Sequence, residues 1–594
     1  MDIKSVIWYV LPVMASLVFK KSRGHSYAYW VRSARVNGKP RIVEQVYLGT
    51  KDRFLEELKL HFTRGKTPGP TPLKQLRVKE FGASAWLWHW ARQLELVEIV
   101  NRHVLAVDKK RRTQLSVGQY LLIAAINRAV QACSKRSLYT DWYQDSVVSR
   151  LCPAPPSELT SQRFWDHMDQ VAPDHIEAIQ QDLLGNLRRL FTLGEETLLY
   201  DTTNYFTFID TFNDRCELAQ RGNNKQKRRD LRQLSLALFA DEKTGLPLYH
   251  QCYRGNQPDV RQATSAWDDW VRTWMKGLKR VPEQLTLVFD KGNCSKSNLV
   301  HLEASPLHYV GSIPGRWVPE LLDIELEHFE KLTLPATKHL KVYRCRYPLW
   351  EKERTLLVVF SPSFYRKQRA AMNRIQRKVD SQLVELAVAI QNWNQTRKGP
   401  GYSEESVQKK IHQWTARDHL RKYLEFDLRV EDSQVVALDW CWNRKLKRKI
   451  QRRHLGKTIL FTDQHEWESS ALALAYRKLW KSEALFRLSK TRRGPWWPLY
   501  HWTDSKIRVH ALYCYFALLL LSILQFKLQE GGLTMSTDHC IARLQQIQEA
   551  LVVYTNGSAE RVLTDLDDAQ KTLAQTLGLF DLARKMGNTV LDES

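Results

Sequence analysis

The sequence predicts a mixed α/β core that is interrupted by a β-rich insertion and flanked by helical regions. Three observations support this fold class. Strand-like and helix-like segments alternate over residues 196–313. Residues 314–465 break that pattern with further strand-like runs and a long basic helix. Helical periodicity dominates residues 76–195 and the C-terminal region 527–594.

The N-terminal part divides into an added segment, a hairpin region and a helical region. Residues 1–24 are expected to be an extension, because their apolar run fits neither a signal sequence nor a core element. Residues 25–75 contain two strand-like runs on either side of Asn37-Gly38, a dipeptide typical of tight hairpin turns, and then a Pro- and Gly-rich linker. Residues 76–195 are predicted to be helical.

Residues 196–313 contain the element order that defines the core. One strand ends on Asp201, a two-stranded hairpin and a helix follow, and a second apolar strand ends on Asp290 before another helix and strand. This β-β-β-α-β-α-β order is the ribonuclease H arrangement, so we expect a ribonuclease H-like core with both acids at one edge of the sheet. A single Asp at a strand end more often caps the next turn, so neither acid identifies a site by itself.

The remaining chain is predicted to complete this core. Residues 314–465 form the β-rich insertion domain, residues 466–526 the second part of the core, and residues 527–594 an acidic helical region. The apolar stretch 511–526 is shorter than a membrane span and contains polar residues. We therefore expect it to be a buried core helix.

Charge and cysteine content predict the kind of partner and compartment. The 594 residues include 90 Lys and Arg against 64 Asp and Glu, for a net charge of +26. Residues 527–594 carry −4, so the rest carries +30. Such an excess favours a nucleic-acid partner. The nine cysteines include no CxxC pair, which is typical of a reducing cytoplasm and indicates neither a zinc site nor disulfides. Basic clusters occur at 109–112, 225–229, 366–369 and 444–453.

A third acid, Glu483, lies in a helical segment with Tyr476 and Lys490 seven residues to either side. Positions seven apart differ by about 20° around a helix, so the three share one face. A carboxylate between a phenol and an ammonium group suits a metal site beside a DNA backbone, although a solvated helix face has the same spacing. Three carboxylates could hold two metal ions for phosphodiester chemistry.

The residues around the three acids resemble those of transposases of the insertion-sequence-four superfamily, in particular its sixteen-thirty-four-like group. The segment from Tyr476 to Lys490 is similar to that group's Tyr-x6-Glu-x2-Phe-Arg-x-x-Lys helix. The other matching segments are Tyr200-Asp201-Thr202-Thr203, Gly245-Leu246-Pro247, Gly255-Asn256, Val288-Phe289-Asp290-Lys291-Gly292 and Ile507-Arg508-x-His510.

The resemblance implies a DDE transposase that cleaves DNA at insertion-sequence ends and transfers the strand into target DNA. Asp201, Asp290 and Glu483 would then be the catalytic residues and the ligands of two Mg²⁺ or Mn²⁺ ions. The implied partner is double-stranded DNA, both element ends and target, bound by a homodimer without a membrane. Residues 76–195 would contribute to DNA binding, and the location would be a bacterial cytoplasm, in association with the nucleoid.

One position departs from the superfamily pattern. Leu479 stands where an Arg is expected four residues before the Glu. We therefore expect Arg487 and Lys490, together with Tyr476, to contact the DNA backbone. Two alternatives stay open: a nuclease of the same fold that does not join strands, and a retained DNA-binding protein without catalysis. The presence of all three acids argues against the second.

Overall fold

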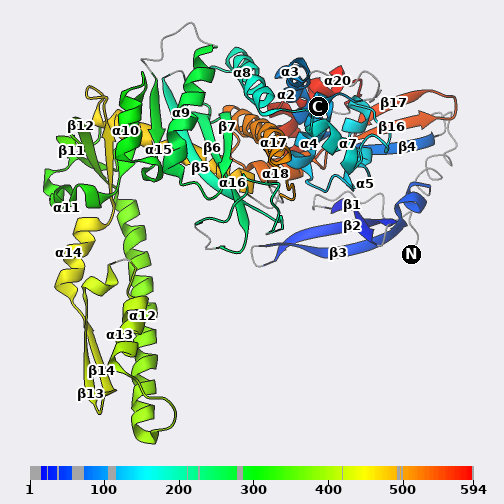
Figure 1. Cartoon of the computed structure of the whole chain (residues 1–594). Coiled ribbons are helices and arrows are strands. Elements are labelled where there is room, and N and C mark those ends of the chain that lie inside the picture. The colour runs from blue at the N-terminus through cyan, green and yellow to red at the C-terminus, as the bar shows by residue number, and fades with distance from the viewer. Residues whose placement is uncertain are drawn as a thin grey trace. The chain divides into compact units, whose positions relative to one another are not determined.

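The computed structural model divides the chain into two compact units. Unit 1 comprises Met1–Trp90, Cys133–Ser161 and Lys527–Ser594, and unit 2 comprises Ala91–Ala132 and Gln162–Phe526. Figure 1 shows the chain coloured from the N-terminus to the C-terminus. The residues described are 15–22, 25–36, 39–56, 73–104, 115–194, 196–210, 212–224, 228–276, 285–417, 419–490, 496 and 499–590.

Unit 1 contains an N-terminal antiparallel sheet in the order β1-β2-β3. Strands β2 and β3 form the predicted hairpin, whereas its turn at residues 37–38 lies outside the described residues. Strand β1 pairs with β2 along its whole length, so residues 15–22 are part of this sheet and not an extension. The bounds are β1 Ala15–Ser22, β2 His25–Val36 and β3 Lys39–Thr50.

A second sheet of unit 1 combines a strand from the N-terminal part of the chain with two strands from the C-terminal part, in the order β17-β16-β4. Residues 76–195 and 527–594 are therefore not wholly helical as predicted, because β4 and β16 satisfy each other's backbone groups across more than 460 residues. Strand β16 is also held by the ion pair between Glu549 and Arg150, whose Oε2 and Nη2 atoms are 2.6 Å apart. The bounds are β4 Leu73–Glu80, α2 Gly82–Gln93, α5 Leu138–Asp141, α6 Val148–Leu151, α18 Thr537–Leu544, β16 Gln548–Tyr554, β17 Ala559–Leu563, α19 Asp568–Thr576 and α20 Leu579–Lys585.

Unit 2 is a mixed α/β structure built on a large sheet with the strand order β10-β11-β12-β15-β9-β8-β5-β6-β7. Strands β5, β8 and β9 are parallel, and the other pairings are antiparallel. The predicted element order from residue 196 to residue 313 is confirmed. The bounds are β5 Thr197–Thr207, β6 Arg232–Asp241, β7 Pro247–Arg254, α9 Asp259–Lys276, β8 Thr286–Phe289, α10 Lys296–Glu303 and β9 His308–Ile313.

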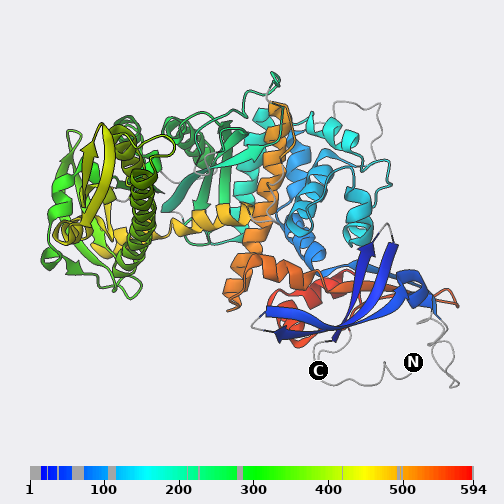
Figure 2. The same ribbon diagram turned by 90° about the horizontal axis from the view of Figure 1, so that it is seen from below.

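Helices cover both faces of the central strands, as Figure 2 shows from below. Tyr200 of β5 contacts Trp267 of α9 on one face. Tyr205, an odd number of residues further along β5, bonds Ser489 of α16 on the opposite face. This alternation follows from the two-residue period of a strand. The other bounds in this unit are α3 Leu96–His103, α4 Val117–Val130, α7 Ser161–Met168, α8 Pro173–Leu190, α11 Pro319–Asp323, α15 Ser469–Arg477, α16 Trp480–Lys490 and α17 Asp504–Glu530.

Helix α17 is the buried core helix that the apolar stretch 511–526 predicts. Within the described ranges it alone is long and apolar enough to cross a membrane by length and composition, and 94% of its most apolar window is buried inside the protein. The hydroxyl group of Tyr515 donates a hydrogen bond to the carbonyl of Pro247, and its ring stacks on His250. These contacts fix α17 against β7.

The predicted insertion, 314–465, divides into two parts. Strands β10, β11, β12 and β15 continue the core sheet, since β12 pairs with β15 and β15 pairs with β9. Only residues 361–456, which we call the arm, leave the sheet between β12 and β15 (Figure 1). The bounds are β10 Glu330–Lys331, β11 Lys341–Leu349, β12 Lys352–Phe360, α12 Pro362–Thr396, α13 Glu404–Trp414, β13 Leu424–Glu431, β14 Gln434–Trp442, α14 Arg444–His454 and β15 Lys457–Thr462.

The arm has an apolar core of its own and is mainly helical, so the prediction of a β-rich insertion is wrong for this part. Buried residues recur along α12 at spacings of three, four and seven, which places them on one helix face. They pack against buried residues of α13, β14 and α14. The buried residues of α12 are Met372, Val379, Leu383, Leu386 and Ile390.

Candidate active site

The strand register places Asp201 and Asp290 side by side. Strands β5 and β8 are parallel neighbours, and Tyr200 is the partner of Phe289. The next residue in each strand direction is an aspartate, and neighbouring strands lie about 4.8 Å apart. Asp201 is not at a strand end as predicted, because β5 continues to Thr207 along β6. It lies where the neighbouring strand β8 stops.

Both aspartates face the side of the sheet that α15 and α16 cover. Thr203 and Tyr205 bond Lys490 and Ser489 of α16, and Asp201 shares their face because it lies two and four residues earlier in the strand. Asp290 accepts a hydrogen bond from Tyr476 of α15. The two carboxylates and the helix pair therefore meet on one side of the sheet.

Asp290 is held in place by two hydroxyl groups. The Tyr476 hydroxyl oxygen lies 2.8 Å from Asp290 Oδ1, and Ser312 of β9 donates to the same oxygen over 3.0 Å. The Tyr476 oxygen is also 2.8 Å from Ser312 Oγ. Burial raises the pKa of Tyr476, and the charges of Asp290 and Glu483 raise it further. Tyr476 therefore stays protonated near neutral pH and can donate to Asp290.

Tyr476 thus contacts an acid of the site, whereas the sequence predicts that it contacts DNA. Its side chain is half-buried and its hydroxyl group is directed at Asp290. Ser312 is a residue that the sequence analysis missed. It lies in β9, the strand next to β8, and its only sequence signal is its place one residue before the end of a strand at the acidic edge.

Helix α16 is anchored to the sheet on both sides of Glu483. Two residues before Glu483, Lys481 donates to the carbonyl of Glu242 over 2.6 Å, just beyond the end of β6 where Asp241 pairs with Leu198. Six residues after it, Ser489 bonds Tyr205. The exposed Glu483 lies between these two anchors on α16, and its charge acts on Tyr476, which bonds Asp290.

The segment that carries Tyr476 and Glu483 is two helices instead of the predicted single one. Helix α15 ends at Arg477 and α16 begins at Trp480, with a turn at residues 478–479. Leu479, at the position of the expected Arg, is buried in this turn. A charged side chain at this buried position would need a counter-charge or hydrogen-bond partners, whereas Leu479 packs there without them.

The cations near Glu483 fall into two groups. Arg477 and Lys481 donate to backbone carbonyls of Ala336 and Lys243. Arg487 and Lys490, which the sequence predicts as DNA contacts, are exposed on α16. Lys490 bonds the hydroxyl group of Thr203, and its ammonium group lies 5.1 Å from the centre of the Tyr205 ring. Lys490 therefore borders the strand that carries Asp201, and Arg487 is exposed one turn after Glu483 on the same helix.

The three acids share one end of the sheet without forming a closed set of metal ligands. In the part of the chain that the structure describes, no three His, Cys, Asp or Glu side chains are grouped so that they could hold an ion. Asp201 and Asp290 lie on fixed strands, whereas Glu483 is exposed on a helix. A rearrangement of the Glu483 side chain is thus required before all three could bind the same ions.

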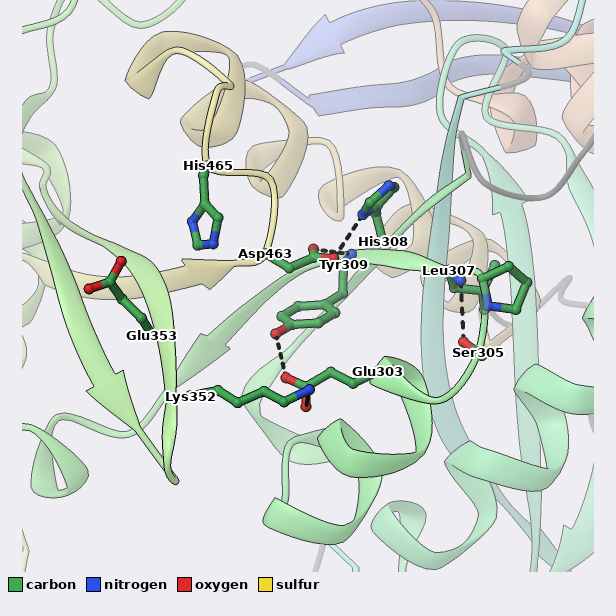
Figure 3. Close-up of a pocket in the computed structure, with 10 residues that line it drawn as sticks. Glu303, Ser305, Leu307, His308, Tyr309, Lys352, Glu353, Asp463 and His465 are labelled. Atoms are coloured by element: carbon green, nitrogen blue, oxygen red, sulfur yellow. Dashed lines mark hydrogen bonds and ion pairs between the residues drawn. The ribbon is translucent and has the colours of Figure 1, made fainter.

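A polar hollow of about 440 Å³ lies at the opposite end of β9 (Figure 3). His308, at the start of β9, bonds Asp463 over 2.7 Å, and Tyr309 donates to Glu303 over 3.2 Å. Ser312, which touches Asp290, lies four residues along the same strand. At about 3.3 Å per residue the hollow is about 13 Å from the acids and is separate from them.

Comparison with known proteins adds little to this geometry. No family model matches the chain, and no curated protein matches it. The chain is similar to a solved structure of a piggyBac transposase in a synaptic complex with hairpin DNA, at 10% identity and a TM-score of 0.34, over 88% of this chain and 89% of that one. A likeness this low carries no weight for fold or activity.

Proposed function

We propose that this protein is a DNA transposase with a ribonuclease H-like core, which cleaves DNA at the ends of an insertion sequence and joins the cut strand to target DNA. The observation that carries the proposal is the pairing of Tyr200 with Phe289 on adjacent parallel strands, which makes Asp201 and Asp290 neighbours. Glu483 lies on α16, which bonds β5 through Ser489 and Tyr205, in a segment whose residues resemble the superfamily's glutamate motif.

The chemistry of the three acids suits two divalent metal ions. Mg²⁺ and Mn²⁺ prefer oxygen ligands, and carboxylates on neighbouring strands can bridge two ions about 4 Å apart. Asp201, Asp290 and Glu483 would hold Mg²⁺ or Mn²⁺, which would activate the attacking oxygen and stabilise the leaving one.

Each protein group near the acids has a role that follows from its contacts. Ser312 and Tyr476 fix the orientation of Asp290. Arg487 and Lys490 would hold a DNA phosphate next to Glu483. In the proposed reaction a water molecule attacks a phosphodiester phosphorus, which leaves a 3′-hydroxyl on one side of the cut and a 5′-phosphate on the other. The 3′-hydroxyl then attacks a phosphorus of the target strand, so that a new phosphodiester bond forms and the target's own 3′-oxygen leaves as a 3′-hydroxyl.

The direct test is a cleavage assay on the DNA that borders the gene. A search of the DNA that borders the gene for short inverted repeats supplies the end sequence, and a duplex that contains one repeat is incubated with the protein and Mg²⁺. We expect a nick at the repeat boundary, followed by joining to a second duplex. Cleavage without joining would identify a nuclease, and binding without cleavage would identify an inactive DNA-binding protein; either result would contradict the proposal.

A second prediction concerns the cations of α16. Arg487→Ala and Lys490→Ala are each expected to weaken binding of an end-containing duplex by about tenfold, because each charged phosphate contact contributes about 1–2 kcal/mol. Cleavage should fall with binding. Lys481→Ala tests the alternative cation: Lys481 donates to backbone carbonyls and anchors α16, so it should not contribute a phosphate contact of its own. Normal binding by both variants, with a defect in the Lys481 variant, would show that the assignment is wrong.

A further inference from the structure

The arm carries a disproportionate share of the positive charge of the chain. Residues 361–456 contain 21 Lys and Arg against ten Asp and Glu, which is +11 of the total +26. Within the arm the charges are segregated. Residues 362–379 and 440–456 together hold 13 Lys and Arg and no Asp or Glu. These two segments are the first half of α12 and the whole of α14 with its flanking residues.

Helix α14 presents its cations on one exposed face. Five of its basic residues are exposed, and at 100° per residue they occupy an arc of about 140°. Ile450, on the opposite side of the helix, is buried, and so is Gln451 at the border of the arc. The exposed arc contains no apolar side chain, whereas helices that bind membranes have an apolar face. The five residues are Arg444, Lys445, Arg448, Lys449 and Arg452.

Contacts between the two helices concentrate this charge in one part of the arm. Lys447 Nζ donates to Asn373 Oδ1 over 2.8 Å and to Gln376 Oε1 over 2.7 Å, so α14 packs on the basic half of α12. Burial lowers the pKa of Lys447, and the charge of Arg369 lowers it further, against the opposing effect of Asp380. The two basic segments therefore repel each other.

Few acids offset the charge of α14. Among the residues that the structure describes, Arg453 is the one α14 cation in an ion pair, with Asp323 at 3.1 Å. Burial lowers the pKa of His454 at the end of α14 to about 4, and nearby positive charges add to the effect. An array of like charges that repel one another gains most from a polyanion, which neutralises them and releases its counterions.

We propose that the exposed face of α14 binds the phosphate backbone of double-stranded DNA without regard to sequence, and so holds the target duplex. Only the identification of that duplex as the target rests on the proposed function. Helix α14 is 11 residues or about 16 Å long, which spans about five phosphates of one strand. The exposed arc of α14 consists of Arg and Lys side chains, which can donate to phosphate groups. It contains no Asn or Gln, the side chains that typically read adenine.

The test measures how DNA affinity depends on salt. Arg444, Arg448 and Arg452 are replaced together by Gln, and the control replaces Lys409, Lys410 and Arg417, three exposed cations in and after α13, by Gln. Both proteins lose the same charge. Each carries Asp290→Asn as well, so that the DNA stays uncut. The probe is a duplex of random sequence, and binding is followed by fluorescence anisotropy between 50 and 200 mM salt.

The logarithm of the association constant falls linearly with the logarithm of the salt concentration. We expect this dependence to be shallower in the α14 variant by about 2 to 3, because each lost phosphate contact removes about 0.9 from the magnitude of the slope. The control slope should stay unchanged. A second variant, Lys445 and Lys449 to Gln, should lower the slope by about 1 to 2. Equal effects in the control, or no effect in either α14 variant, would overturn the proposal.

The same experiment separates this inference from the proposed function. A shallower slope in the α14 variants, together with a wild-type protein that cleaves no end-containing duplex, would support the α14 surface and contradict the transposase. Normal cleavage and joining by the wild-type protein, together with unchanged slopes in the α14 variants, would support the transposase and overturn the α14 surface.

Discussion

Replacing Glu483 by Gln is expected to reduce metal-dependent cleavage and joining by about a thousandfold or more, while DNA binding in the absence of metal stays intact. The substitution keeps the size of the side chain and removes the charge that would hold a metal ion. A thousandfold loss corresponds to about 4 kcal/mol in the activation barrier. The measurement is single-turnover cleavage of an end-containing duplex in Mg²⁺, beside anisotropy with the same duplex in EDTA.

Two nearby glutamates provide matched controls. Glu466 is 97% exposed and lies 4.0 Å from Arg346, and Glu468 is the residue before the first turn of α15. An acid near a helix start is stabilised by the helix dipole and needs no catalytic role. Glu466→Gln and Glu468→Gln should therefore cleave normally. Inactive control variants together with a normal Glu483 variant would reassign the third acid.

The same assay compares the two aspartates. Asp201→Asn and Asp290→Asn should be as inactive as Glu483→Gln, since the loss of any ligand would disable both ions. Tyr476→Phe should have a smaller effect, because it removes a hydrogen bond to Asp290 and no ligand. If Tyr476→Phe were as inactive as Asp290→Asn, the phenol would have a role beyond positioning.

Local periodicity was enough to predict the order of elements in the core, but not the partners of each strand. The hairpin of β6 and β7 and the strands β8 and β9 have clear apolar patterns bounded by turns. By contrast, β12 and β15 pair with each other although a 96-residue arm separates them in the sequence. Strands β4 and β16 pair although more than 460 residues separate them in the sequence. A sequence pattern indicates a strand but carries no information on its distant neighbour.

The candidate site was predicted to the extent that it depends on strand ends. Asp201 and Asp290 were predicted to share an edge because each follows an apolar strand, and they are neighbours because Tyr200 pairs with Phe289, although β5 itself continues to Thr207. Ser312 and the break at Leu479 could not be predicted, since both depend on packing between elements. The role of Tyr476 also differs, because the heptad spacing to Glu483 assumes one continuous helix, whereas a turn separates α15 from α16.

Replacing Glu303 by Gln is expected to destabilise unit 2 by about 3–5 kcal/mol, because it leaves the guanidinium group of Arg354 buried without a counter-charge. The side chains of Arg354 and Glu303 are only 3% and 13% exposed, and they form an ion pair. Arg354 Nε also donates to the hydroxyl group of Tyr309 over 2.9 Å. The pair connects β12, β9 and α10 beside the hollow of Figure 3.

Hydrogen exchange of β9 and β12 and thermal unfolding measure this effect, with Glu351→Gln as the control. Glu351 is 84% exposed and pairs with Lys296 at the surface, so its loss should cost less than about 1 kcal/mol. A double variant, Glu303→Leu with Arg354→Met, should recover much of the stability, because an apolar pair needs no counter-charge. Equal losses in the Glu303 and Glu351 variants would show that the buried pair contributes no more than a surface pair.

The same pair predicts how stability depends on pH. Burial alone would raise the pKa of Glu303, but the hydrogen bonds and charges of Lys352 and Arg354 outweigh it and hold the pKa below the ordinary value of 4.5. An acid with a lowered folded-state pKa stabilises the protein above its unfolded pKa, and this contribution disappears as the pH falls through the folded-state pKa. The difference between wild type and Glu303→Gln should therefore be constant near neutral pH and shrink below about pH 4.5. A difference that persisted unchanged into strong acid would mean that the charge of Glu303 is not what stabilises Arg354.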